Sequence, residues 1–213
     1  MSSVRSILSR PAVGRAAPLG KMTEREFVDW CDSDTWAEWV DGEVILMNAV
    51  SADHSDAAFS LVHLIRGYLD EHDLGKLLGE PFQIRFAKLR RRRSPDLIFI
   101  SNEQLKSLDR NVFDGAPELI VEIVSPESQS RDRREKYLEY EAAGVKEYWI
   151  VDPLSRGFEM HVLGRNGKYS PIPQIEGVVH STVLAGFFIR PIWFWQPKFP
   201  KVSTLLKEMA RKR

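Results

Sequence analysis

Two kinds of apolar periodicity alternate along this chain and predict its main elements. Residues 54–72 carry an apolar stripe with a helical period, made of Ala58, Leu61, Val62, Ile65 and Leu69. Residues 82–86 alternate apolar with polar side chains, which is typical of a strand with one buried face. Near-continuous apolar runs at 94–100, 118–124 and 147–153 are typical of strands that are buried on both faces.

Capping and turn residues predict where further elements begin and end. Thr23-Glu24-Arg25-Glu26 has the form of a capping box, which predicts a short helix. Asp41-Gly42 predicts a hairpin turn, with Glu43 at the start of its second strand. A helix from about Arg131 to Ala143 ends at a capping Gly144. Because that helix separates two buried strands, a right-handed crossover between parallel neighbours follows.

This order of elements predicts one α/β domain. The chain has 213 residues, of which 43% are hydrophobic, and this length suits a single domain with its own core. The end of the chain is β-rich, with apolar segments at 178–183 and 187–192. We expect residues 1–21 to be a disordered leader, 22–200 to be the domain and 201–213 to be a basic tail.

Charge is balanced overall and concentrated in two places. There are 30 Lys and Arg and 30 Asp and Glu residues, so the net charge is zero and gives no argument for a nucleic-acid partner. One basic run consists of Lys88 and residues 90–93, and the other follows Lys201. Taken alone, each is better explained as a solvated loop or tail.

The single cysteine and the absence of a long apolar run indicate the compartment. Cys31 has no partner for a disulfide within the chain, which suits a reducing compartment, and we expect a cytoplasmic protein. No apolar run has the length that spans a membrane. The aromatic-rich stretch 187–195 is either a base-stacking platform or, more often for such runs, core or a subunit interface, and it supports a homodimer.

Asp96 and Glu122 are the candidate site residues. Glu122 stands within an apolar strand, where a carboxylate is costly unless it is paired or bound to a cation. Two acids from adjacent strands supply the hard oxygen ligands that Mg²⁺ takes. The alternative is that Asp96 caps the start of a strand and Glu122 forms a structural salt bridge, and spacing alone favours this alternative.

Lys136 follows Glu122 in the chain and favours a metal site over a structural role for the two acids. Asp132, Lys136 and Tyr140 lie along one helix face, near the strand end that holds Glu122. From there the Lys136 ammonium can hold an attacking water and offset charge on a phosphate. The alternative is a surface Asp–Lys pair worth about 0.3–0.5 kcal/mol.

An ordered set of motifs resembles the Uma-two family of restriction endonucleases, within the PD-(D/E)XK nuclease superfamily. The resemblance covers roughly residues 22–196. Its motifs are Pro95-Asp96, Glu118 to Ser128, the stripe Asp132, Lys136 and Tyr140, and Gly144 to Pro153, with Asp41 to Ile45 and Leu184-Ala185-Gly186 as further matches.

The resemblance implies a restriction-endonuclease-like fold, with a mixed central sheet flanked by helices. It implies a phosphodiesterase site for Mg²⁺ or Mn²⁺ in which Asp96 and Glu122 are metal ligands. Glu43 becomes the acid that the earlier hairpin contributes, in contact with water or a second metal ion. The superfamily places its lysine two residues after the second acid, where this chain has Val124, so the family pattern selects Lys136 instead.

The expected reaction is therefore hydrolysis of phosphodiester bonds, with DNA as the expected partner. Arg91, Arg92 and Arg93 precede the metal strand, and we expect them to contact phosphates without reading sequence. Gln83 is a weaker candidate for the same contact. Two alternatives stay open: a catalytically silent nucleic-acid-binding or interaction protein that keeps the fold, and a hydrolase of small phosphoesters, which a deep closed pocket would favour.

Overall fold

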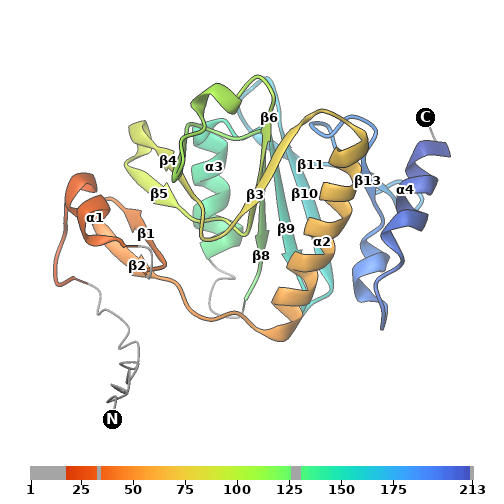
Figure 1. Cartoon of the computed structure of the whole chain (residues 1–213), viewed down its shortest axis with the longest axis horizontal. Coiled ribbons are helices and arrows are strands. Elements are labelled where there is room, and N and C mark those ends of the chain that lie inside the picture. Colours follow the sequence, from red (N-terminus) through yellow and green to blue (C-terminus); the bar gives the residue numbers. More distant parts are fainter. Residues whose placement is uncertain (1–17, 33–34, 126–130, 212–213) are drawn as a thin grey trace, which may run out of the picture.

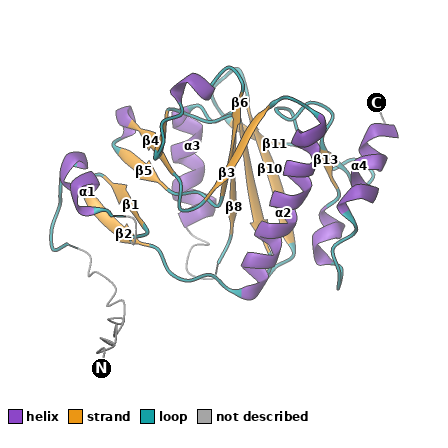
Figure 2. Cartoon of the chain, viewed as in Figure 1, coloured by secondary structure: helices purple, strands orange, loops and turns teal. Residues whose placement is uncertain are grey.

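A six-stranded mixed sheet forms the centre of the protein (Figures 1 and 2). The computed structural model describes residues 18–32, 35–125 and 131–211. The strand order is β11-β10-β9-β8-β6-β3, in which β8 and β9 run parallel and the other neighbours run antiparallel. The strands are β3 (Gly75–Gly79), β6 (Leu97–Ser101), β8 (Leu119–Ile123), β9 (Glu147–Asp152), β10 (Gly157–Leu163) and β11 (Tyr169–Pro171). The predicted mixed α/β fold is confirmed.

Helices cover both faces of this sheet, as Figure 1 shows. The long helix α2 (Ala52–Glu71) packs on one face, where Val121 of β8 belongs to its apolar cluster. Helix α3 (Tyr137–Ala143) packs on the other face, in a cluster that contains Ile120 of β8. Since successive residues of a strand point to opposite faces, β8 must be apolar on both, which explains its continuous run.

The end of the chain forms helix α4 (Val202–Arg211), so the expectation of a basic tail over 201–213 is wrong for these residues. Val202, Leu205 and Met209 are buried in the same cluster as α2, because their spacing places them on one helix face. A Cβ atom at Gly67 of α2 would lie 3.3 Å from Val202 Cγ1, so the two helices cross closely there. The surrounding lysines and arginines concealed this stripe in the sequence.

A second, smaller sheet lies beside the central one at the left of Figure 1. Its order is β2-β1-β5-β4-β7. The strands are β1 (Ala37–Val40), β2 (Glu43–Leu46), β4 (Gln83–Phe86), β5 (Arg91–Arg93) and β7 (Val112–Asp114), and α1 (Glu24–Trp30) precedes them. The predicted capping box at Thr23 and the predicted hairpin are both confirmed. Asp41 and Gly42 both have positive φ angles, as the two-residue turn between twisted strands requires.

The basic run is part of this second sheet, which corrects its expected place in a loop. Arg91, Arg92 and Arg93 form β5, between β1 and β4. Arg93 is 1% exposed and donates to both carboxylate oxygens of Glu139 and to Glu38. Sequence alone did not show this, because the acidic partners of the run lie far away along the chain.

The aromatic-rich stretch near the end contributes to the core of its own chain. It contains β13 (Phe188–Ile189), paired with β12 (Val179–His180), and a 3₁₀ helix over Pro191–Trp195. Phe187 stacks on Trp149 of β9, with 6.1 Å between ring centroids. This packing explains the run within one chain, and the homodimer stays a prediction.

The expected leader falls mostly outside the described residues, which begin at residue 18. Among the helices that the structure describes, none has the length and apolar character needed to cross a bilayer.

We expect Arg93→Met to destabilise the fold by about 3–5 kcal/mol, because it leaves two buried carboxylates without their shared cation. The measurement is chemical denaturation followed by circular dichroism. The exposed Arg110 provides the control, and Arg110→Met should change the free energy of unfolding by no more than about 0.5 kcal/mol. Equal stability of the two variants would contradict a structural role for Arg93.

Candidate active site

Asp96 and Glu122 lie opposite each other at one end of the central sheet. Strands β6 and β8 pair with Leu97 opposite Val121, and continuing this register by one residue places Asp96 opposite Glu122. Opposite residues of an antiparallel pair project from the same face of a sheet. The backbone N–H of Ile123 also donates to Asp96 Oδ2 at 2.5 Å, which ties the two strand ends together.

Glu122 is held by two side chains from the next helical segment. Lys136 Nζ lies 2.9 Å from Glu122 Oε2, and the Tyr140 hydroxyl donates to Glu122 Oε1 at 2.6 Å. All three residues are buried. Burial, and then the charge of Glu122, raises the pKa of Tyr140 well above its ordinary value, so the phenol stays a hydrogen-bond donor. The expected approach of Lys136 to the acidic pair is confirmed, and its chemical role stays a prediction.

The position that the superfamily gives to its lysine is apolar here. Val124 is 3% exposed and belongs to the cluster that contains Tyr140 and Tyr148. Lys136 instead ends a π-helical turn (Arg131–Lys136) that leads into α3. Such turns are frequent at functional sites because they re-aim a side chain within a helix. The side chain of Asp132, which completes the expected stripe, lies outside the described part of the structure.

The hairpin directs Glu38, rather than the expected Glu43, towards this group. Glu43 is exposed at the start of β2. Glu38 on β1 is 0% exposed, accepts from Arg93 Nη1 at 2.8 Å and from the Ser94 N–H at 3.1 Å, and lies 3.8 Å from Lys136 Nζ. Burial by itself raises the pKa of Glu38, but Lys136 and Arg93 outweigh it and lower the pKa to about 2. An acid between the apolar Ala37 and Trp39 was the sequence signal for Glu38.

His54 is a partner of Asp96. It stands in the first turn of α2, is 4% exposed, and its Nε2 lies 3.1 Å from Asp96 Oδ1. Burial lowers the pKa of His54, but the contact with Asp96 outweighs it, so the pKa is raised. The pairing joins residues distant in sequence, which explains why the pattern missed it.

Glu80 is a further acid at this end of the sheet that sequence reasoning missed. It follows β3, and the pairing of Gly79 with Leu97 places the next residue, Glu80, opposite Asp96. Burial, and then the negative charge of Asp96, raises the pKa of Glu80 to about 7. The motif Gly79-Glu80-Pro81 looks like an ordinary turn in the sequence.

The predicted phosphate contacts are occupied by acids of the same chain. Arg91 pairs with Asp41 and Glu139, and Arg92 pairs with Glu24. Arg93 is buried, as described above. Gln83 donates to the Ala37 carbonyl and accepts from Arg92, so it does not join the acidic group.

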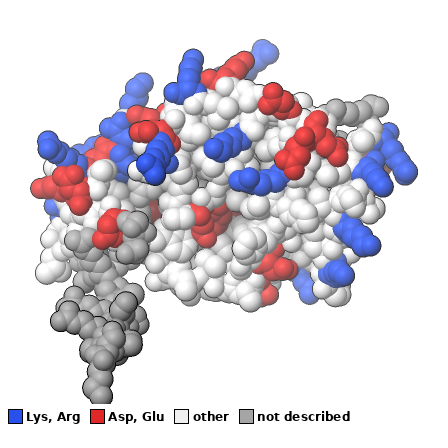
Figure 3. All heavy atoms as spheres, in the orientation of Figure 1, with Lys and Arg blue, Asp and Glu red and all other residues white. Residues whose placement is uncertain are grey.

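The described surface agrees with this mixing of charges. On the face in Figure 3, basic and acidic side chains alternate around the rim, and no continuous basic stripe crosses it. The arrangement therefore gives no support to a ready-made phosphate grip at residues 91–93.

The donors at the sheet end fit a divalent cation that keeps part of its water shell. Within the described ranges, no group of three or more His, Cys, Asp or Glu side chains is arranged to hold a metal ion. Mg²⁺ commonly uses one or two carboxylates and completes its coordination with water and substrate phosphate. Asp96 and Glu122 provide such carboxylates, on neighbouring strands.

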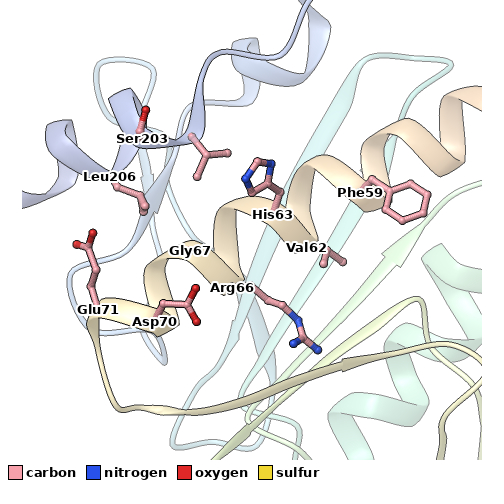
Figure 4. A pocket seen from close by; sticks show the side chains of 10 residues that line it. Phe59, Val62, His63, Arg66, Gly67, Asp70, Glu71, Ser203 and Leu206 are labelled. Atoms are coloured by element: carbon pink, nitrogen blue, oxygen red, sulfur yellow. The ribbon is translucent and has the colours of Figure 1, made fainter.

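A separate groove lies between α2 and α4, away from this acidic group (Figure 4). It has a volume of about 650 Å³, and Phe59, Val62, Leu206 and Val202 give it an apolar side. None of the site residues described above lines it. The acidic group at the sheet end and the groove are therefore separate sites on the molecule.

Comparison with known proteins gives one family and one fold. Residues 25–190 match the Uma2 family, described as "Putative restriction endonuclease". A crystal structure of "a putative nuclease belonging to DUF820" from Anabaena variabilis matches with a TM-score of 0.66 and 16% identity, over 88% of this chain and 99% of that chain. At this identity the likeness shows the fold. No curated protein matches the chain.

The depressed pKa of Glu38 predicts a specific loss of stability in acid. Its carboxylate stabilises the fold at any pH above its ordinary pKa of 4.5, and this contribution disappears as the pH falls towards about 2. We expect Glu38→Gln to lower the free energy of unfolding at neutral pH by about 3 kcal/mol. Wild type and variant should converge between these two pH values in denaturation experiments.

The exposed Glu43 provides a matched control, and Glu43→Gln should leave the pH dependence of stability unchanged. A constant difference between wild type and Glu38→Gln down to pH 2 would contradict the role given to the charge of Glu38.

Proposed function

This chain belongs to the Uma2 family, and we propose that it is a metal-dependent endonuclease that hydrolyses phosphodiester bonds of DNA. The observation that carries the proposal is the position of Lys136. Its ammonium lies 2.9 Å from the carboxylate of Glu122, and Glu122 stands opposite Asp96 on the neighbouring strand. A pair of carboxylates can hold a divalent cation, and a buried lysine beside them can stabilise charge on a phosphate, so this arrangement supports the proposal.

Asp96 and Glu122 would hold Mg²⁺ or Mn²⁺. When bound, the cation supplies Lewis-acid stabilisation of the charge on a phosphodiester. Carboxylates on two neighbouring strands provide hard oxygen donors for it without a closed cage, which leaves room for substrate.

We assign to Lys136 the role of contacting the attacking water or the phosphate. Its ammonium has three donor hydrogens, and Glu122 takes one of them at 2.9 Å. The ammonium is buried, so its charge acts in a medium of low dielectric and is worth more than on the surface. In this position it would orient a water molecule or offset charge that develops on the phosphate.

Two further residues keep the carboxylates in place. Tyr140 donates to Glu122 at 2.6 Å, and His54 lies 3.1 Å from Asp96. Tyr140 contacts Oε1 of Glu122, and His54 contacts Oδ1 of Asp96, so each fixes the direction of one carboxylate. We assign these residues to positioning, with no role in proton transfer.

Recognition of DNA would use the phosphate backbone without base reading. The described residues include exposed Lys88 and Arg90 beside the ion-paired Arg91–Arg93 strand. Contacts of this kind fix position on the duplex and weaken as salt rises. Whether the chain acts as an active enzyme or as a silent DNA-binding protein with the same fold is decided by cleavage.

We expect Asp96→Asn and Lys136→Gln each to lower cleavage of supercoiled plasmid by at least about 100-fold in Mg²⁺ or Mn²⁺. The control is Lys106→Gln, which removes an exposed lysine and should cleave like wild type. Fluorescence anisotropy with labelled DNA should show binding by all three variants.

Cleavage by Asp96→Asn at the rate of wild type would overturn the site assignment. DNA binding by wild type without cleavage in either metal would favour the silent alternative.

A further inference from the structure

Two acids of the central sheet lie in one row that faces helix α3. Glu159 of β10 pairs with Ile150 of β9, and Ile150 pairs with Glu122 of β8. Ile150 belongs to the apolar cluster that contains Tyr140 of α3, so the row lies on the α3 face of the sheet. Neighbouring strands are about 4.8 Å apart, so the two acids stand about 10 Å from each other across the sheet.

The π-helical turn before α3 places one cation on each of these acids. Arg133 Nη1 donates to Glu159 Oε1, and Lys136 Nζ lies 2.9 Å from Glu122 Oε2. Residues three apart lie on the same side of a helical turn, so both side chains reach the sheet together. The two residues between them are exposed. Within the described part of the turn, Arg133 and Lys136 are therefore the side chains with ion pairs to the sheet.

Arg133 has a second anchor at the end of β9. Its Nη2 donates to Asp152 Oδ2 at 3.1 Å. Asp152 is 1% exposed, and its Oδ1 accepts from the backbone N–H groups of Leu154 and Ser155, at 3.1 Å each. These backbone contacts fix the carboxylate in the turn after β9. A planar guanidinium that holds two carboxylates at once is itself fixed in position and direction.

The contacts of the Lys136 ammonium depend on the position of this turn, because two acids compete for it. The ammonium lies 2.9 Å from Glu122 and 3.8 Å from Glu38, so a small shift of the backbone changes which acid it faces. Misplacement of a reacting group by about 1 Å can lower a rate by about 100-fold. Tyr140 attaches the following helix to Glu122, and Arg133 attaches the other end of the turn.

We propose that Arg133 is a positioning residue for Lys136. Its ion pairs with Asp152 and Glu159 fix the π-helical turn so that the ammonium faces Glu122. This inference rests on the proposed function, in which Lys136 contacts the attacking water or the phosphate. Arg133 acts through Lys136 and does not contact the substrate, because two carboxylates of its own chain occupy its guanidinium.

The first test is cleavage of a DNA duplex in Mg²⁺ or Mn²⁺. We expect Arg133→Gln to lower kcat about tenfold and to leave KM unchanged, because the side chain acts on the chemical step and not on DNA binding. Arg133→Lys should cleave at an intermediate rate, since an ammonium keeps charge but cannot hold two carboxylates in fixed directions. Arg134→Gln, which removes the exposed arginine next in the same turn, is the control and should cleave like wild type.

The double variant Arg133→Gln/Lys136→Gln separates positioning from an independent effect. If Arg133 acts through Lys136, the double variant should cleave no more slowly than Lys136→Gln alone. A further tenfold loss in the double variant would overturn the proposal, and so would cleavage by Arg133→Gln at the rate of wild type.

Chemical denaturation gives the same comparison without nuclease activity. Lys136→Gln should lower the free energy of unfolding less in the Arg133→Gln background than in wild type, because the displaced ammonium has already lost part of its contact with Glu122. In the Arg134→Gln background it should have its full effect. Additive losses for Arg133 and Lys136 would contradict the positioning role. If Arg133→Gln does not fold, Arg133→Lys takes its place in both comparisons.

The proposed function and the role of Arg133 fail in different ways. If wild type cleaves no DNA, or if Lys136→Gln cleaves like wild type, the proposed function is overturned, and the coupling in denaturation alone decides whether Arg133 positions Lys136. If Lys136→Gln loses cleavage while Arg133→Gln cleaves like wild type, the role of Arg133 is overturned and the proposed function stands.

Discussion

The burial of the Lys136 ammonium is the constraint on which the rest of the structure depends. Its charge lies between Glu122 on the central sheet and Glu38 on the second sheet, and all three side chains are almost completely excluded from solvent. Removing such ions from water costs several kcal/mol each, and the cost is recovered only when every charge keeps its partner. The two sheets therefore cannot separate without exposing or orphaning a charge.

Arg93 extends this constraint to the rest of the second sheet. Its guanidinium donates to Glu38 and forms a bidentate ion pair with Glu139 of α3. The elements β1, β5 and α3 therefore meet at one guanidinium. Lysine could not replace it, because only the planar guanidinium holds two carboxylates in fixed directions. The basic run Arg91–Arg93, which we expected to contact phosphates, therefore stabilises the packing of the hairpin against the site.

The parts of this structure that follow from local pattern were predictable, and the parts that follow from long-range pairing were not. Periodicity predicted the helix of 54–72 and the buried strands around Asp96 and Glu122, because burial on one or two faces acts on neighbouring residues. The approach of Lys136 was predictable because it follows Glu122 closely in the chain.

Other site residues depend on strand register and on pairing between distant segments. Glu38, His54 and Glu80 reach the sheet end from three separate elements, and nothing in their local sequence sets the register that brings them there. The choice of Glu43 for the hairpin acid shows the same limit, since alternation decides which acid faces inward and the pattern of a short hairpin leaves that open.

If the chain has the proposed function, the balance of charge at the sheet end indicates that the cation binds before the scissile phosphate. Lys136 is shared between the carboxylates of Glu38 and Glu122, and the Asp96 carboxylate contacts His54, so carboxylates predominate at the sheet end. A phosphodiester is itself an anion and is repelled by such a surface at short range. Binding of the scissile phosphate should therefore depend on a cation at Asp96, whereas the rest of the backbone is free to bind through more distant lysines and arginines. Because the buried lysine is already committed to carboxylates, it can adjust the position of water or phosphate but cannot replace that cation.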